Sequence, residues 1–407
     1  MNEGDIVIVG GGHAAAQLCA GLATAGQGVR VQLVCAEAEL PYQRPPLSKA
    51  FLKDPNEVVQ AHRAPAWFAD NGITVHLGDA VVAIDRQRRC VRLQSGRELA
   101  WANLVLATGT RARRLPALPE TLDNVLVLRS AADAQGLRER LVAAHHVTVL
   151  GGGFIGLEIA ATAQALGKTV TVLEAAPRLL ARSVSPELAE HVLQTHRASG
   201  IDVRLGVIAG GFEIAGNRLV ALTADGVREP VDLLVLGIGA LADTTLAAAA
   251  GLACDNGVVV DACMRTSDPA ILAIGDCTNF PLFGNGSRLR LESVQNANDQ
   301  AKTALATLSG REEPYRALQW FWSEQGSLRL QMAGLMPAEG EGVMRYRRPG
   351  ATPASFSVLH YRSGQLACVE SVNAPLDHMA ARKLLEAGKN PPPELACDPG
   401  VALKSLF

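Results

Sequence analysis

The chain has 407 residues, too many for one hydrophobic core, so two or three domains are expected. Hydrophobic residues make up 48% and charged residues 19%, which favours buried parallel sheets and excludes a disordered chain. The formal net charge of −2 excludes a general attraction to nucleic acid or to anionic membranes. Because no apolar run could span a bilayer and no cleavable leader precedes the first strand, we expect a cytoplasmic protein.

The first predicted elements are a strand, a glycine-rich turn and a helix. An apolar strand over residues 5–9 runs into the sequence Gly10-Gly11-Gly12-His13-Ala14-Ala15. Gly10 and Gly12 allow a pyrophosphate to approach the backbone, and the helix start supplies N–H groups and partial positive charge. Glu37, expected at the end of the next strand, is placed to accept hydrogen bonds from a ribose. The pattern predicts a dinucleotide site, although Glu37 could also be a solvated glutamate after a strand.

The middle of the chain repeats this pattern. A Pro-rich loop over 41–49, strands near Val75, at 91–93 and at 104–109, and a linker over 111–116 come first. A strand over 147–150 then leads into Gly151-Gly152-Gly153-Phe154-Ile155-Gly156 and an apolar helix, with Glu174 at the end of the following strand. One glycine-rich turn is weak evidence. Two complete copies indicate two dinucleotides held by one chain, as in an electron-transfer flavoenzyme.

Glu174 also predicts which nicotinamide nucleotide binds. A carboxylate that accepts from the ribose 2′-hydroxyl repels a 2′-phosphate, and residues 175–177 offer no arginine to neutralise it. NADH is therefore expected over NADPH. Arg178 and Arg182 are close enough to weaken this preference, or could instead stack on adenine or lie in solvent.

The remaining elements follow in order. Strands are expected at 203–205, 218–220, 233–239, 258–261 and 271–276, with a packed alanine-rich helix at 246–250. After Pro314 the pattern changes to an aromatic cluster at 320–322 and alternating stretches such as 355–359, which predict an antiparallel sheet in a third domain from about 315.

The eight cysteines lie at positions 19, 35, 90, 254, 263, 277, 368 and 397, with no C-x-x-C pair. This spacing argues against a metal knuckle and against a local redox dithiol. Each thiol is expected to be a small buried apolar side chain, and no metal site is predicted.

Seven motifs in order carry a family resemblance. They are the first fingerprint, Pro45-Pro46-Leu47-Ser48-Lys49, Ala107-Thr108-Gly109, residues 151–158, Ala273-Ile274-Gly275-Asp276, residues 292–297, and Phe321-Trp322-Ser323-Glu324-Gln325. Over nearly its whole length the chain resembles the oxygenase-coupled ferredoxin reductases, FAD enzymes of the glutathione-reductase fold. Ala15 replaces a common glycine, which close helix packing still tolerates, and Glu324 replaces a usual aspartate.

The resemblance implies an α/β fold with two Rossmann-like dinucleotide-binding domains and a C-terminal α+β domain. It places a discontinuous FAD domain at 1–110 and 240–314, an NADH domain at 111–239 and the third domain at 315–407.

The resemblance also implies roles for particular residues. The FAD site would be formed by Gly10, Gly12, His13, Ala14, Ala15, Glu37, Arg44, Pro45, Lys49, Val82, Ala107, Thr108, Gly109, Arg129, Asp276, Glu292, Ser293, Val294 and Trp322. Residues 293–297 would open a helix whose positive end stabilises reduced flavin, and Asp276 would bind the ribityl chain, cap a helix, or both. The NADH site would be formed by Gly151, Gly153, Phe154, Ile155, Gly156, Glu174, Arg182, Gly237, Ile238 and Gly239.

Lys49 and Glu158 resemble an ion pair beside the reactive N5 edge of the flavin. Hydride transfer needs orientation and electrostatics rather than a protein acid or base, which suits such a pair. Taken alone, Lys49 reads as an exposed loop lysine and Glu158 as a surface helix residue. Trp320 and Trp322 fit packing as well as flavin shielding or electron exit at Trp322.

The predicted function is electron transfer from NADH through FAD to a [2Fe-2S] ferredoxin that serves a cytochrome P450 or a ring-hydroxylating dioxygenase. The absence of cysteine from 41–49 disfavours disulfide reductases and NADH oxidases. A rubredoxin reductase and a signalling flavoprotein like apoptosis-inducing factor remain alternatives. Two arginine groups, Arg345, Arg347 and Arg348, and Arg111, Arg113 and Arg114, are candidates for docking an acidic ferredoxin.

Overall fold

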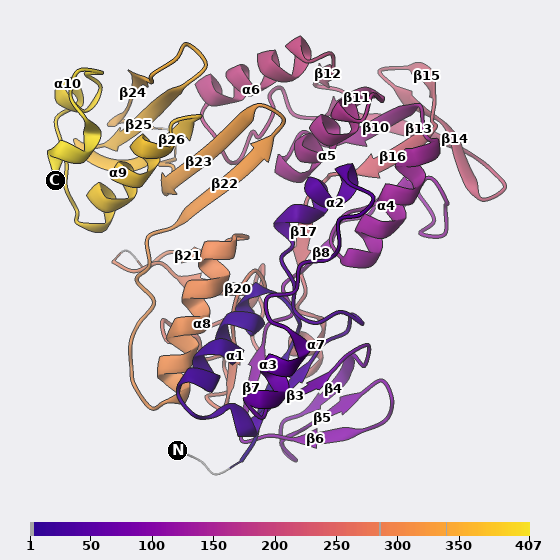
Figure 1. Cartoon of the computed structure of the whole chain (residues 1–407), viewed down its shortest axis with the longest axis vertical. Coiled ribbons are helices and arrows are strands. Elements are labelled where there is room, and N and C mark those ends of the chain that lie inside the picture. Colours follow the sequence, from indigo (N-terminus) through magenta and orange to yellow (C-terminus); the bar gives the residue numbers. More distant parts are fainter. Residues whose placement is uncertain (1–3, 285, 339) are drawn as a thin grey trace. The chain divides into compact units, whose positions relative to one another are not determined.

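The computed structural model describes residues 4–284, 286–338 and 340–407, which form two compact units (Figure 1). The first unit contains residues 1–44, 58–111 and 240–317, and the second contains 45–57, 112–239 and 318–407. None of the helices in the described part of the chain combines the length and apolar character needed to cross a bilayer.

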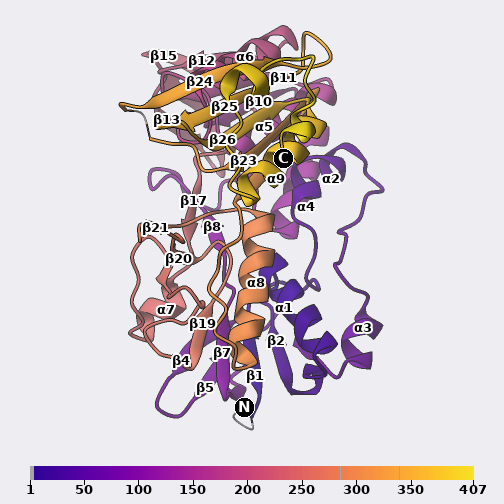
Figure 2. The same ribbon diagram turned by 90° about the vertical axis from the view of Figure 1, so that its left-hand side faces the viewer.

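The first unit is built on a five-stranded parallel sheet. Its strand order is β19 (Ile271–Ala273), β7 (Asn103–Leu106), β1 (Ile6–Val9), β2 (Val31–Val34) and β3 (Thr74–His76). All four residues of β1 are buried, as expected for the central strand of a sheet covered on both faces. Helices α1 (His13–Thr24) and α8 (Val294–Leu308) pack against each other beside this sheet (Figures 1 and 2).

Smaller elements complete this unit. They are the antiparallel sheet β4 (Val81–Asp85), β5 (Cys90–Leu93) and β6 (Glu98–Ala100); the sheet β18 (Val258–Val259), β20 (Thr278–Pro281) and β21 (Arg288–Leu289); the pair β8 (Thr110–Ala112) and β17 (Ala240–Ala242); and the helices η1 (Gly28–Arg30), α3 (Pro65–Asp70) and α7 (Thr245–Ala249). The alanine-rich helix is thus confirmed as α7. The predicted linker at 111–116 is wrong at its start, because Arg111 and Ala112 belong to β8.

The second unit contains a matching parallel sheet. Its strand order is β12 (Asp202–Leu205), β11 (Thr169–Glu174), β10 (His146–Leu150), β16 (Leu233–Leu236) and β9 (Val125–Leu126). Around it lie α4 (Ala131–Ala143), α5 (Phe154–Ala165), α6 (Pro186–Ala198) and the antiparallel sheet β13 (Ala209–Ala215), β14 (Arg218–Ala224) and β15 (Val227–Pro230). In both parallel sheets the strand that precedes a glycine fingerprint has a neighbouring strand on each side. Open α/β sheets bind ligands outside the carboxyl ends of such strands.

The predicted C-terminal antiparallel sheet is confirmed in this unit. Its order is β22 (Trp320–Gln325), β23 (Leu328–Gly334), β26 (Gln365–Val372), β25 (Phe356–Arg362) and β24 (Val343–Pro349). It is followed by α9 (Pro375–Glu386), α10 (Pro393–Ala396) and η3 (Leu403–Leu406). Apolar side chains of α9, α10 and η3 pack with β23, β25 and β26 in one core.

Residues 45–57, with η2 (Pro45–Ser48) and α2 (Ala50–Lys53), fold with the second unit. Arg138 of α4 holds them there. Its guanidinium lies 4.1 Å from the centre of the Phe51 ring and donates to the carbonyls of Phe51, Asp54 and Glu57. A cation that donates to three carbonyls at once fixes residues 45–57, the segment that contains Lys49 and α2.

Candidate functional site

The first glycine fingerprint lies at the carboxyl end of β1, where α1 begins. Gly10 has φ +120°, and a Cβ on it would collide with the carbonyl oxygen of Ala107. Gly12 is the opposite case, because a Cβ there would meet no atom within 4 Å. Ala15 is fully buried, so the alanine fits the close packing of α1. His13 is the first residue of α1 rather than a loop residue.

This contrast gives a testable prediction. Gly10→Ala should cost more than about 2 kcal/mol of unfolding free energy, since both the φ angle and the Ala107 carbonyl reject a side chain. Gly12→Ala should leave stability almost unchanged but weaken FAD retention, because its methyl would occupy open space that a pyrophosphate needs. Denaturant unfolding and flavin content after gel filtration measure the two effects. Equal losses for both variants would contradict this assignment.

Glu37 and Arg44 form a polar cluster in the first unit. Glu37 lies in the loop beyond β2, which ends at Val34, so the predicted strand end is a few residues too late. Its carboxylate accepts from Tyr42 Oη at 2.6 Å and from Arg44 Nη2 at 2.6 Å. Burial lowers the pKa of the Arg44 guanidinium, but Tyr42, Glu37 and Asp276 together outweigh burial and raise that pKa. The cluster therefore brings Glu37, Arg44 and Asp276 together.

The other predicted FAD residues of this unit lie at strand and helix ends. Ala107, Thr108 and Gly109 follow β7, and the Thr108 hydroxyl donates to the carbonyl of Asp243 at 2.7 Å. The predicted helix start at 293–297 is confirmed: Ser293 caps α8 by accepting from Asn296 N, and Val294 is its first residue. Glu292 pairs with Arg290 at 2.5 Å. Val82 is about half exposed and lies within β4, not at the end of a strand or helix.

The second fingerprint lies at the carboxyl end of β10. Gly151 has φ +108°, and a Cβ on it would lie 2.5 Å from the Gly237 carbonyl oxygen. A Cβ on Gly156 would collide with the Gly151 carbonyl, so α5 can approach the loop only with glycine there. Gly153 is open, with its nearest neighbour at 3.8 Å. Each fingerprint thus contains one glycine whose backbone conformation and neighbours exclude a side chain, and another glycine with open space beside it.

Glu174 is the last residue of β11, as predicted. Its Oε2 accepts from the backbone N–H of Gly152 at 2.6 Å and its Oε1 from that of Ala176 at 2.7 Å. The carboxylate therefore braces the fingerprint loop. This contact could not be predicted from the sequence, because almost any residue type supplies the backbone N–H that donates to Glu174.

Two arginines near Glu174 have different surroundings. Arg178 donates to the carbonyls of Val184 at 2.7 Å and Ala181 at 2.6 Å, so its guanidinium holds a local turn. Arg182 is exposed, and its Nη2 would lie 3.8 Å from a Cβ on Gly239. Arg182 therefore lies near Gly239, one of the residues predicted for the nucleotide site.

An aromatic residue of β22 packs against the first residue of α5. The Phe154 ring lies 4.6 Å from that of Phe321 in β22, whereas Ile155 is about half exposed. Trp320 and Trp322 have ring centres 5.5 Å apart and are partly buried. Arg129 precedes the Ser130 cap of α4, and its backbone N–H donates to Asp133.

Lys49 and Glu158 form an ion pair in the second unit. Lys49 Nζ lies 2.6 Å from Glu158 Oε2 and also donates to the carbonyl of Pro45 at 3.0 Å. Glu158 is buried within α5, which rules out the reading of a surface helix residue. Two hydroxyls complete its carboxylate: Ser48 donates to Oε2 at 2.5 Å and Ser323 to Oε1 at 2.7 Å. Both serines stand in motifs that the sequence singled out, but no role was predicted for their side chains.

The eight cysteines are free thiols, and Cys35 lies beside Gly11 of the first fingerprint. A Cβ on Gly11 would lie 2.9 Å from the Cys35 sulfur. Burial and the charge of Glu37 raise the pKa of the Cys35 thiol to about 12, despite the opposing effect of Arg44. A thiol held protonated is a poor nucleophile. Cys254 is exposed and Cys397 is only partly buried, so the prediction that every cysteine is buried is wrong at these two positions.

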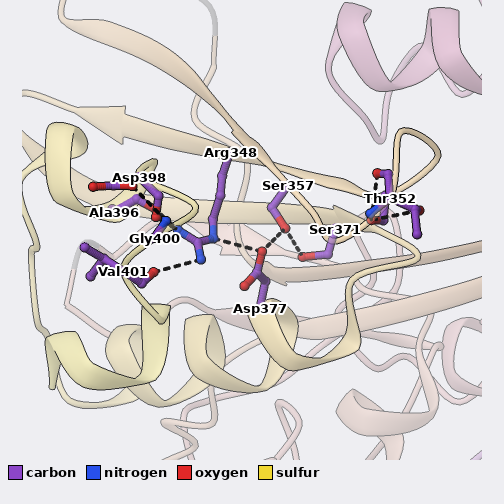
Figure 3. A network of polar contacts seen from close by, with 10 residues as sticks. Arg348, Thr352, Ser357, Ser371, Asp377, Ala396, Asp398, Gly400 and Val401 are labelled. Carbon is purple, nitrogen blue, oxygen red and sulfur yellow. Dashed lines mark hydrogen bonds and ion pairs between the residues drawn. The ribbon is translucent and has the colours of Figure 1, made fainter.

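Arg348 does not belong to a docking surface. It is buried, with Nε 3.1 Å from Asp377 Oδ2, and its remaining N–H groups donate to the carbonyls of Ala396, Asp398 and Val401 (Figure 3). The guanidinium thereby fastens the C-terminal segment to β24 and α9. The prediction that Arg348 meets a ferredoxin is wrong, because every guanidinium nitrogen has a partner inside the fold.

Arg348→Met should lower the unfolding free energy by about 3 kcal/mol, because Asp377 loses its buried cation and three carbonyls lose their donors. Arg347→Met is a matched control on the same strand. Arg347 is exposed and pairs with Glu187 at 2.9 Å, so about 1 kcal/mol is expected. Urea unfolding with a C-terminal probe measures both. A cost no greater for Arg348 than for Arg347 would contradict the fastening role.

Known proteins match this geometry. A model of the pyridine nucleotide-disulphide oxidoreductase family matches residues 4–301, and a reductase C-terminal model matches residues 320–407. The chain belongs to the pyridine nucleotide-disulphide oxidoreductase family. Rhodocoxin reductase of Rhodococcus erythropolis, a curated relative, is 41% identical over 402 residues, covering 98% of this chain and 93% of that protein.

Solved structures agree with the family. The ferredoxin reductase of the CYP199A2 system from Rhodopseudomonas palustris has a TM-score of 0.93 and 42% identity, covering 98% of this chain and 99% of that one. The reductase in a covalent putidaredoxin reductase–putidaredoxin complex has a TM-score of 0.93 and 36% identity, covering 100% and 98%. The predicted fold and family are confirmed.

The residues of this pyridine nucleotide-disulphide oxidoreductase fit the cofactors that the family implies, FAD and NAD(H). Each fingerprint has an open glycine, Gly12 or Gly153, directly before a helix of twelve residues whose first N–H groups have no side chain at the cap to accept them. Such a helix start is suited to a phosphate. The segment 45–57 contains no cysteine, and its Lys49 forms an ion pair with Glu158.

Proposed function

We propose that the chain is an FAD-dependent reductase that carries electrons from NADH to a [2Fe-2S] ferredoxin serving an oxygenase. Overall, one NADH reduces two ferredoxins and releases NAD⁺ and one proton. The observation that carries the proposal is the presence of two fingerprint sites together with the ion pair between Lys49 and the buried Glu158, in a segment 45–57 that holds no cysteine. A segment 45–57 without cysteine suits a one-electron protein acceptor, and the relatives and solved structures of similar length are reductases of such acceptors.

The sites divide the work as follows. Residues 1–110 and 240–314 would form the FAD domain, with Gly12 and the start of α1 at the pyrophosphate and Glu37, Arg44 and Asp276 as polar contacts. Residues 111–239 would form the NADH domain, with Gly153 at the pyrophosphate and Glu174 at the ribose. Residues 315–407 would form the third domain. These boundaries follow the sequence motifs. Residues 45–57 fold with the second unit, so Lys49 belongs to the unit that contains residues 112–239.

Bound FAD supplies the chemistry that a side chain cannot, because it accepts a hydride and gives up electrons singly. The role of the chain is to orient and to stabilise. We assign Lys49 to the reactive edge of the flavin, where its ammonium stabilises negative charge on reduction, and Glu158 to holding that ammonium. Trp322 is assigned to shielding the flavin or to the electron exit.

A cytoplasmic location belongs to the same proposal. The eight cysteines are free thiols and NADH is an intracellular reductant, so a reducing compartment suits both.

Anaerobic titration tests the proposal. The purified yellow protein should bleach with one equivalent of NADH, form a long-wavelength charge-transfer band and respond little to NADPH. Cytochrome c reduction should then become rapid only when a [2Fe-2S] ferredoxin is added. A rapid response to rubredoxin alone would identify the rubredoxin reductase alternative, and slow turnover that ignores the acceptor would favour a signalling flavoprotein.

A further inference from the structure

A buried chain of hydrogen bonds ends at the Glu158 carboxylate. It begins at His196 of α6, whose Nε2 lies 2.9 Å from Gln325 Oε1. The Gln325 amide donates to Ser323 Oγ at 3.1 Å, and Ser323 donates to Glu158 Oε1 at 2.7 Å. His196, Gln325, Ser323 and Glu158 are each at least nine-tenths buried, so water does not compete with these contacts.

Every link in this chain has a fixed direction. The oxygen of an amide only accepts, so the ring nitrogen of His196 must donate to Gln325. Burial lowers the pKa of His196, which favours the neutral ring, and the contact with Gln325 Oε1 places its proton on Nε2. The Gln325 N–H₂ group then donates to Ser323 Oγ, and the single hydroxyl proton of Ser323 is left to point at Glu158. All donors therefore run toward the carboxylate.

The opposite side of the carboxylate is bound independently. Glu158 Oε2 accepts from Lys49 and from Ser48, while the Thr162 hydroxyl donates to the backbone carbonyl of Ser48 at 2.8 Å. Each carboxylate oxygen thus has its own donors, and rotation of the carboxylate about its bond to Cγ would break contacts on both sides. Charge-assisted bonds of this kind are short and directional.

We propose that Ser323, held by Gln325 and His196, is a positioning residue that fixes Glu158 and through it the Lys49 ammonium. The C-terminal domain thereby helps to position the Lys49–Glu158 ion pair, which the proposed function assigns to the flavin. The inference rests on that function. Ser323 and Gln325 lie on β22, which belongs to the C-terminal sheet, and His196 belongs to α6 of the second βαβ region. Neither serine nor glutamine needs to touch a cofactor for this role.

Stopped-flow reduction of the holoenzyme by NADH tests the proposal, together with the midpoint potential of the bound flavin. Ser323→Ala should slow flavin reduction at saturating NADH roughly 5- to 20-fold, as expected for one lost charge-assisted hydrogen bond, and should shift the flavin potential. The dissociation constant for NADH should stay within about twofold, since no ground-state contact to NADH is removed. Ser323→Thr, which keeps the hydroxyl, should restore most of the rate.

Ser371→Ala is the matched control. Ser371 is equally buried in the same sheet and bonds only to Ser357 among the contacts described, at 3.0 Å. It should leave the reduction rate and the flavin potential unchanged. Gln325→Met is a second variant in case Ser323→Ala folds poorly, because it leaves the serine but removes the group that directs its proton. It should slow reduction in the same direction by a smaller factor.

A double-mutant cycle decides whether Ser323 acts through Glu158. In a Glu158→Gln background, Ser323→Ala should change the rate by less than about twofold, because the group it positions is already altered. Full multiplication of the two effects, or a Ser323→Ala variant that behaves like Ser371→Ala, would overturn the inference. Failure of the wild-type flavin to accept electrons from NADH is a different result, which overturns the proposed function itself.

Discussion

Replacing Lys49 with alanine is expected to slow reduction of the flavin by NADH roughly 100-fold while FAD stays bound. The ammonium is the only charged donor on Glu158 among the described residues, and its removal takes a fixed positive charge away from the hydride acceptor. Flavin retention should not suffer, because Ser48 and Ser323 continue to hold the Glu158 carboxylate and the FAD fingerprint lies elsewhere in the sequence. Anaerobic stopped-flow absorbance gives the rate, and dye equilibration gives the flavin potential.

Lys53→Ala is the control for this experiment. Lys53 closes the same short helix, α2, but is exposed and makes no contact with Glu158 in the described structure. Its rate should equal that of the wild type. If Lys49→Ala is reduced as fast as Lys53→Ala with an unchanged potential, Lys49 is a bystander and its ion pair with Glu158 is structural.

The second large effect concerns the choice of coenzyme. Glu174→Ala should narrow the preference for NADH over NADPH by roughly 10- to 100-fold, measured as the ratio of kcat/KM values, because the carboxylate that repels a 2′-phosphate is gone. The structure adds a second expectation. Since Glu174 accepts from the N–H groups of Gly152 and Ala176, its loss also loosens the fingerprint loop, and KM for NADH itself should rise.

Glu174→Gln separates these two contributions. Its amide oxygen can still accept one backbone N–H, so the loop is better kept while the charge is lost. It should narrow the coenzyme preference with a smaller rise in KM for NADH than Glu174→Ala. Glu190→Ala, an exposed glutamate of α6 in the same unit, should change neither quantity. An unchanged ratio in both Glu174 variants would remove Glu174 from the nucleotide site.

The sequence by itself determined the glycine fingerprints and the order of the elements around them. Gly10, Gly151 and Gly156 could be recognised because their backbone conformations or neighbours exclude a side chain, which leaves glycine as a visible requirement. Strand β1 and strand β10 were predicted for a similar reason, since strands buried on both faces read as continuous apolar runs. These features are local, so the residue types of one short segment are enough to indicate them.

Only the tertiary structure decided which side chains meet. Ser48, Glu158 and Ser323 are far apart along the chain, yet they share one carboxylate, and hydroxyl groups are too common in sequences to indicate such a contact in advance. Arg348 reads like Arg347 in the sequence, but a strand turns neighbouring side chains to opposite faces, so one is buried among carbonyls and the other is exposed. Partners, burial and donor direction depend on distant segments, and the folded chain alone brings those segments together.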